Sequence, residues 1–221
     1  MTPYNVGCTH EIDLTEYASV LQGELDFHVF IDTWGTGGWQ LTLDFEYTAG
    51  TPKYPYSTVT EIWDGRYDFG NMANLQPVPD KSVYLPKGTE EAEIIFSTSG
   101  HGWGQDNTGN AAEFYHAKHD IMVDDTKEFT QDLWNECNPN PDKCYNQQGT
   151  WMHNRAGWCP GAIAPPHKFN ITKFKDQTSM KLGYKFQDNY RDFCHPNNPS
   201  CVSGTTCSNC NAGYNPHYNV D

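Results

Sequence analysis

Two alternating runs flank a glycine-rich turn in residues 24–47, which read ELDFHVFIDTWGTGGWQLTLDFEY. In the run from Glu24 to Trp34, and more cleanly from Trp39 to Tyr47, apolar side chains fall at every second position. Period-two alternation sends successive side chains to opposite faces of a β-strand, and the glycines between the runs suit a tight turn. The pattern predicts a β-hairpin that presents Asp32 and Trp34 at its end.

The remainder of the chain also favours short strands. Further strands are predicted at Ser57–Trp63, Lys81–Leu85, Glu91–Ser97, His119–Asp124, Lys168–Thr172 and Met180–Phe186. No helical period of 3.6 residues is sustained, which argues against a mainly helical protein. We therefore predict an all-β fold with antiparallel pairing, a sandwich or a jelly roll.

Charge and composition restrict the partners. The chain has 14 Lys and Arg against 28 Asp and Glu, a formal net charge of −14. Nucleic acids and anionic membranes both favour clustered basic residues, so neither is expected as a partner. No stretch approaches the length of a membrane span. Aromatic residues make up 14% of the chain, which suits the binding of sugar rings but is also common in β proteins.

The eight cysteines indicate disulfides formed outside the cytosol, and hence an extracellular or secreted protein. A zinc knuckle is the alternative for the four that crowd the C-terminal end, Cys194, Cys201, Cys207 and Cys210. Their pairing is left open, as is that of Cys8 and Cys144. Asn170 begins an Asn-Ile-Thr sequence and is a predicted N-glycosylation acceptor. No signal peptide opens the chain, so we expect a processed chain or a piece of a longer one.

A polar stretch from Ser99 to His119 is the first candidate for a functional loop. It reads SGHGWGQDNTGNAAEFYHAKH and combines a glycine-rich turn with a carboxylate, Glu113. Loops of this kind, on the rim of a β scaffold, often carry binding sites. The plain alternative is a surface connection with a solvated glutamate. His116 and His119 lie three residues apart, which would place them on opposite faces of a strand, so no metal site is predicted.

A series of blocks resembles one family, the bacterial peptide-N-glycosidase F group of amidases. The blocks occur in this order: Thr2-Pro3-Tyr4, Phe30 to Trp34, Gly50-Thr51-Pro52, Ser99 to Trp103, Ala112-Glu113-Phe114, Gly149-Thr150-Trp151 and Arg155 to Gly161. The resemblance implies two antiparallel jelly rolls side by side, with the active site between them. It assigns residues 1–50 to the end of the first jelly roll, 51–188 to the second with a long disulfide-tied loop, and 189–221 to a cysteine-rich irregular segment.

The resemblance also implies a reaction and its residues. The family hydrolyses the amide that joins asparagine to the first N-acetylglucosamine of an N-glycan, without metal or cofactor, so a glycoprotein is the expected partner. The motif positions make Glu113, Asp32 and Arg155 the catalytic candidates. Substrate-binding positions fall on Trp34, His101, Trp103 and Phe114. Cys137 and Cys159 fall on a family disulfide.

Departures from the family pattern support a rival interpretation. Ala111 and Tyr115 stand where the family has two cysteines around the glutamate. The family's principal aspartate precedes the Thr-Pro-Tyr block, at which this chain begins, and Met1 stands at an interior hydrophobic position. We therefore expect a chain truncated at both ends, with only part of the first jelly roll. The rival is a non-catalytic glycan-binding or structural module of an extracellular assembly; a copper monooxygenase relative is weaker, because no two histidines are adjacent.

Overall fold

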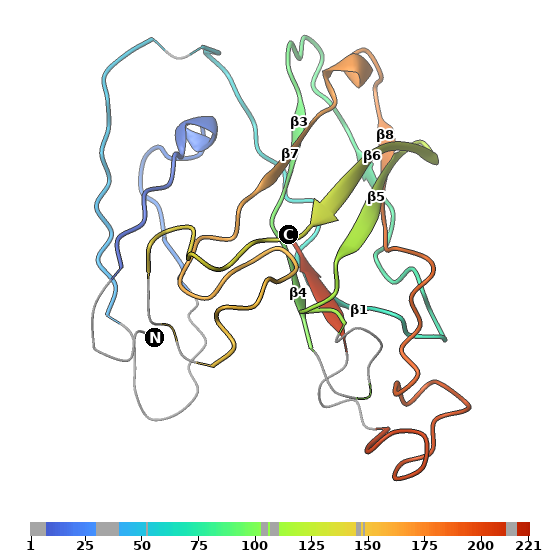
Figure 1. Ribbon diagram of the computed structural model, residues 1–221. Helices are drawn as coiled ribbons and strands as arrows, with labels where there is room; N and C mark the ends of the chain where they lie inside the picture. Colours follow the sequence, from blue (N-terminus) through green and yellow to red (C-terminus); the bar gives the residue numbers. More distant parts are fainter. Residues whose placement is uncertain are drawn as a thin grey trace. The chain divides into compact units, whose positions relative to one another are not determined.

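A computed structural model describes residues 8–29, 40–51, 53–102, 106, 111–144, 147, 149–210 and 216–221. Contacts divide the chain into two units: Glu61–Asp221 together with the described residues 8–10, and Glu11–Thr60. Figure 1 labels the strands of the larger unit. They are β1 (Gly65–Asp68), β2 (Lys81–Val83), β3 (Glu93–Phe96), β4 (Thr98–His101), β5 (Ala117–Val123), β6 (Thr126–Leu133), β7 (His167–Asn170), β8 (Met180–Lys185) and β9 (His217–Val220).

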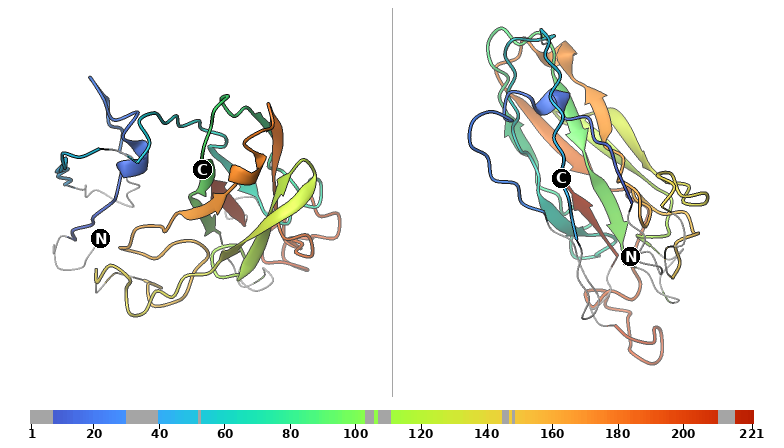
Figure 2. Two further views of the ribbon diagram at one scale, coloured as in Figure 1. Left: turned by 90° about the horizontal axis from the view of Figure 1, so that it is seen from above. Right: turned by 90° about the vertical axis from the view of Figure 1, so that its left-hand side faces the viewer.

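The strands form three antiparallel sheets, in the orders β1-β9-β4, β2-β8-β5-β6 and β3-β7. The predicted all-β, antiparallel fold class is confirmed. The first two sheets pack face to face, since the Tyr218 ring of β9 lies edge-on to the His119 ring of β5 with centroids 4.5 Å apart. Figure 2 shows the same strands from above and from the side.

An aromatic core fills the space between the sheets. On the inner faces, Tyr218 and Tyr184 are fully buried, and Phe96 contacts both Trp63 and Tyr184. Phe69 stacks on Tyr190 with centroids 4.4 Å apart and planes 8° from parallel. Because Tyr190 begins the cysteine-rich segment, this stack attaches that segment to the sandwich.

Four disulfides tie the irregular segments. Their pairings are Cys8–Cys144, Cys137–Cys159, Cys194–Cys207 and Cys201–Cys210. The four C-terminal cysteines are therefore bonded to one another rather than arranged around zinc. Cys8–Cys144 anchors the start of the described chain to the long loop that follows β6.

Two local predictions within the larger unit were wrong. Ser57–Trp63 is not a strand: Trp63 is only 4% exposed in the core, its indole N–H donates to the Pro79 carbonyl at 2.8 Å, and the strand begins at Gly65. Residues 189–221 are not irregular throughout, because they end in β9, the central strand of its sheet. The β9 alternation covers only four residues, too short a run to stand out after a cysteine-rich segment.

Residues 24–47 belong to the smaller unit, whose described residues contain the 3₁₀ turn η1 (Thr15–Tyr17) and no strand. The two alternating runs do lie side by side, because the Phe27 and Phe45 rings are 4.7 Å apart. The apolar side chains of both runs are exposed, from 40% for Leu25 to 75% for Tyr47. Residues 30–39, where the turn is predicted and which include Asp32 and Trp34, lie outside the described residues. Over the described ranges, no helix is long and apolar enough to cross a membrane.

The buried imidazole of His119 predicts sensitivity to acid. Its Nδ1 accepts a hydrogen bond from the Gln187 backbone N–H at 3.0 Å, and burial lowers its pKa from 6.5 to about 3. Below pH 6.5 the unfolded chain protonates this ring while the folded chain does not. The free energy of unfolding should therefore fall by about 1.4 kcal/mol per pH unit from this group as the pH drops from 6.5 toward 3.

Urea unfolding at several pH values between 7 and 4 measures that slope. His119→Asn should flatten the slope, whereas His28→Asn, at an exposed histidine of the smaller unit, should leave it unchanged. Equal slopes in the wild type and His119→Asn would contradict the assignment.

Candidate functional site

Backbone hydrogen bonds bring the two predicted site segments together. The N–H of Gly100, on β4, donates to the Ala156 carbonyl at 2.9 Å, and the Ala156 N–H donates to the Glu113 carbonyl at 3.0 Å. The Glu113 N–H in turn donates to the Gly102 carbonyl at 3.2 Å. The residues around Glu113 and Arg155, 42 positions apart in sequence, are thus held beside one strand.

A glycine permits this close approach. Gly157 has φ +82°, and a Cβ atom built there would lie 2.0 Å from the Thr98 carbonyl oxygen. On its other side, Arg155 exchanges two backbone hydrogen bonds with Asn135, at 2.8 and 3.1 Å. The segment is fixed along both edges, which determines where the Arg155 side chain begins.

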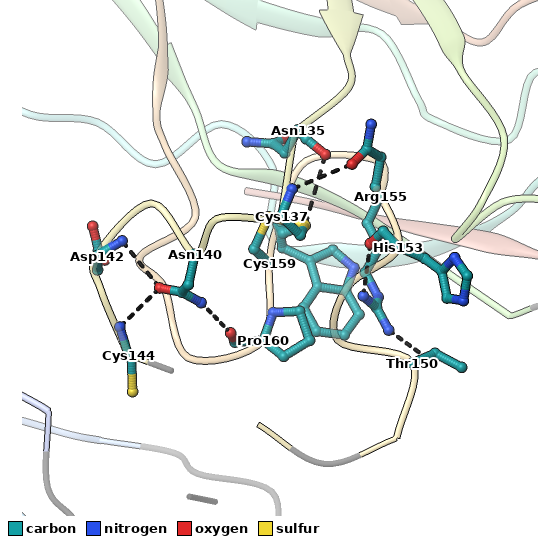
Figure 3. Close-up of a disulfide and its surroundings, with 12 residues drawn as sticks. Asn135, Cys137, Asn140, Asp142, Cys144, Thr150, His153, Arg155, Cys159 and Pro160 are labelled. Carbon is teal, nitrogen blue, oxygen red and sulfur yellow. Dashed lines mark hydrogen bonds between the residues drawn. A yellow bond between two sulfur atoms is a disulfide. The ribbon is translucent and has the colours of Figure 1, made fainter. Parts of the chain in front are cut away.

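The guanidinium of Arg155 is buried and makes three hydrogen bonds within the chain. Its Nε donates to Glu113 Oε1 at 2.9 Å, Nη1 to the His153 carbonyl at 3.0 Å and Nη2 to Thr150 Oγ1 at 2.6 Å. Figure 3 shows the last two of these contacts. The side chain is only 3% exposed, so the ion pair with Glu113 is shielded from water.

Two aromatic rings pack against this guanidinium. Its carbon lies 4.9 Å from the centroids of Phe114 and of Trp158. Flat stacking on rings suits the delocalised charge of arginine. The Trp158 indole N–H donates to the Gly100 carbonyl at 2.9 Å, and its ring stacks on His101 with centroids 5.3 Å apart.

The carboxylate of Glu113 has one oxygen engaged and one available. Its side chain is 13% exposed, and Oε1 accepts the Arg155 hydrogen bond. In the part of the chain that the structure describes, no donor bonds to Oε2. The geometry is that of an oriented carboxylate with a free acceptor.

His101 is a neutral neighbour of this centre. It is partly buried, its Nε2 lies 2.8 Å from Ser99 Oγ, and it stacks on His217 as well as on Trp158. Burial lowers its pKa to about 4, with smaller contributions from His217 and Arg66. Near neutral pH the imidazole can donate and accept hydrogen bonds but carries no charge.

The sequence-predicted residues therefore divide into two groups. The structure gathers Glu113, Arg155, Phe114 and His101 around one centre, whereas Asp32, Trp34 and Trp103 lie outside the described residues. Sequence reasoning missed the contributions of Thr150, His153 and Trp158. Thr150 and Trp158 belong to the quoted motif blocks, so the signal was present, but the blocks alone do not show which side chains reach the arginine.

The two positions without the family cysteines are anchored by packing. Ala111 is fully buried, and the Tyr115 ring lies 5.2 Å from that of Tyr190. The Tyr115 hydroxyl also accepts a hydrogen bond from Gln187 at 3.1 Å. These contacts hold the Glu113 turn against the core without a local disulfide.

His116 and His119 lie in different environments. His119 is buried in the core, and His116 pairs with Asp132 at the surface. Within the described ranges, no group of three His, Cys, Asp or Glu side chains is arranged to hold a metal ion.

Asn170 lies exposed at the end of β7. Its Oδ1 accepts a hydrogen bond from the Thr172 N–H at 2.9 Å, which forms a local turn. The side chain is accessible at the surface, and its glycosylation stays a prediction.

Fold and site together define an antiparallel β-sandwich protein with a carboxylate–arginine centre lined by aromatic rings. A family model described as "Peptide-N-glycosidase F, C terminal" matches residues 69–205. The chain belongs to the peptide-N-glycosidase F family.

Known relatives agree with this assignment. The chain is 31% identical over 208 residues to peptide-N(4)-(N-acetyl-beta-D-glucosaminyl)asparagine amidase F of Elizabethkingia miricola, covering 85% of this chain and 56% of that protein. It therefore spans little more than half the length of this curated relative. A crystal structure of the amidase superposes with a TM-score of 0.61 at 24% identity, over 77% of this chain and 52% of the other. PNGase F from Flavobacterium meningosepticum gives a TM-score of 0.57 at 23% identity, over 77% and 51%.

Replacing Gly157 tests the close approach to β4. Gly157→Ala should destabilise the protein by more than about 2 kcal/mol, because the added methyl group overlaps the Thr98 carbonyl in addition to the strained φ. Gly88→Ala is the matched control, since Gly88 has φ +88° but no atom within 4 Å of a built Cβ. Chemical denaturation measures both; equal losses would show that the contact with β4 is unimportant.

Replacing Arg155 tests the buried ion pair. Arg155→Lys keeps the charge but cannot reach three partners or stack as a plane, so we expect a loss of about 3 kcal/mol in unfolding free energy. Arg66→Lys, at an exposed arginine on β1, should stay within about 0.5 kcal/mol of wild type. A loss in Arg155→Lys no larger than that of Arg66→Lys would refute the structural importance of the guanidinium.

Proposed function

We propose that this protein hydrolyses the amide between asparagine and N-acetylglucosamine in N-glycoproteins. The observation that carries the proposal is Glu113, a carboxylate held by Arg155 through Oε1 with Oε2 open to an external donor. The 31%-identical relative is an N-acetylglucosaminyl-asparagine amidase, which supports the choice of bond.

In this reaction Glu113 acts on water. Oε2 accepts a proton from a water molecule as the water oxygen adds to the carbonyl carbon of the asparagine side chain. The bond from that carbon to the sugar nitrogen then breaks, and the proton passes to the departing nitrogen. The products are an aspartic acid side chain and a glycosylamine.

Arg155 acts as a positioning residue. Its donors reach Glu113, His153 and Thr150, two rings pack against it and its side chain is only 3% exposed, so little of it is left for the substrate. Its contribution is to hold the Glu113 carboxylate in one orientation. The motif position made Arg155 a catalytic candidate, and we assign it this positioning role instead.

Sugar contacts are assigned to the rings and polar groups around this pair. Phe114 contacts the Arg155 guanidinium, and His101 stacks on Trp158. Asp32, Trp34 and Trp103 complete the proposal as predicted site residues. The four disulfides are consistent with an extracellular location, where glycoproteins are met.

The experiment is the release of glycan from a denatured N-glycoprotein, followed by gel mobility. Glu113→Gln should lower the rate at least about a hundredfold, because the amide cannot take a proton from water. Gln still offers an oxygen to Arg155 but removes the counter-charge of the buried guanidinium, so the melting temperature should fall, and the assay is run at a temperature at which circular dichroism shows the variant to be folded. Glu136→Gln, an exposed glutamate in the loop after β6, should keep full activity.

Two results would overturn the proposal. One is wild-type activity in a folded Glu113→Gln variant. The other is binding of glycoprotein by the wild type without any glycan release, which would establish the non-catalytic module instead.

A further inference from the structure

A cavity of about 230 Å³ lies in the long loop that follows β6. Its walls are mainly apolar and include Pro141, Ala162, Ile163 and Pro165, with Asn135 and Asp142 as polar members. No aromatic ring is among the described residues that line it, and these residues offer a pyranose no flat stacking surface. An aliphatic group fits this lining better than a sugar.

The two walls of the cavity are joined by three cross-links. The disulfide Cys137–Cys159 connects them, and the Asn140 amide donates to the Pro160 carbonyl at 2.8 Å. The Ile163 N–H donates to Asp142 Oδ2 at 2.7 Å. Figure 3 shows the disulfide and the Asn140 bond. Ligand sites are usually preformed in this way, and a loop without such links would collapse onto its apolar side chains.

Asn135 connects the cavity to the candidate active site. Its backbone bonds to Arg155, while its side-chain carboxamide has no hydrogen-bond partner in the part of the chain that the structure describes. In Figure 3 this side chain points away from the Arg155 guanidinium. A carboxamide offers one donor and one acceptor, which is the complement of a peptide group.

The distance between the cavity and Glu113 allows one extended peptide to reach both. Asn135 and Arg155 are directly bridged, so their Cα atoms are roughly 5 Å apart. The Arg155 side chain then reaches Glu113. Because an extended peptide covers about 3.3–3.6 Å per residue, the cavity is within roughly four residues of a glycosylated asparagine placed at Glu113.

We propose that this cavity binds an apolar side chain of the polypeptide part of the substrate, with Asn135 hydrogen-bonded to a peptide group of the same segment. The inference rests on the proposed amidase function for the identity of the substrate. It adds a second recognition element, which reads the peptide rather than the glycan.

Paired synthetic glycopeptides test the cavity in the active protein. Each pair carries Leu or Ser at one position within about four residues of the glycosylated asparagine. At the position whose side chain enters the cavity, we expect the Leu peptide to have a KM at least about fivefold lower than the Ser peptide, because an aliphatic side chain leaves water. Ala162→Leu fills the cavity and should abolish this preference. Ala73→Leu, at an exposed alanine, is the control and should retain the preference.

A second variant and a second readout keep the test independent of folding and catalysis. Ile163→Ala enlarges the cavity and should shift the preference from Leu toward Phe. A fluorescent sugar-free Leu peptide reports binding directly, and Ala162→Leu should weaken that binding at least about fivefold. Peptide binding lost in Ala162→Leu, without glycan release by any form, would support the cavity and refute the amidase.

Three outcomes would overturn the proposal. The first is an unchanged Leu preference in folded Ala162→Leu or Ile163→Ala. The second is the same KM for every Leu and Ser pair. The third is displacement of the bound Leu peptide from the wild-type protein by free N-acetylglucosamine. That result would make the cavity a sugar site.

Discussion

Burial of the Arg155 guanidinium is the constraint on which the site depends. Removing a charged group from water is unfavourable by several kcal/mol unless it is paired and hydrogen-bonded. Glu113, His153 and Thr150 meet that need, and the rings of Phe114 and Trp158 pack against the guanidinium. The orientation of the Glu113 carboxylate is therefore a consequence of how the chain compensates a buried cation.

The core of the sandwich and the candidate site are both in contact with Gly100. Gly100 has Tyr218 beneath it, and a Cβ atom there would lie 2.7 Å from the tyrosine ring. Gly100 also accepts the Trp158 indole hydrogen bond and donates to Ala156. A small residue at this crossing lets the site segment lie directly on the sheet, so changes in core packing should be felt at the carboxylate.

Strands with clear alternation could be predicted, and others could not. Residues 180–186 alternate cleanly, and β8 occupies most of that run. β6 reads TKEFTQDL, whose polar composition hides a strand with buried residues only near its end. The run at 57–63 looked like a strand, yet Trp63 is used as a core side chain in irregular backbone. Alternation in the sequence does not predict a strand where a neighbouring sheet determines which side chains are buried.

The amino-acid sequence by itself determined the all-β class, the disulfide-rich character and the family motifs that contain Glu113 and Arg155. Only the tertiary structure decided that Arg155 binds Glu113, that Cys8 joins Cys144, and that Asn135 faces a cavity beside the site. The physical reason is sequence separation. Periodicity and motif spacing report the conformation of neighbouring residues, whereas these contacts join side chains 42 and 136 positions apart, whose meeting depends on how the sheets pack.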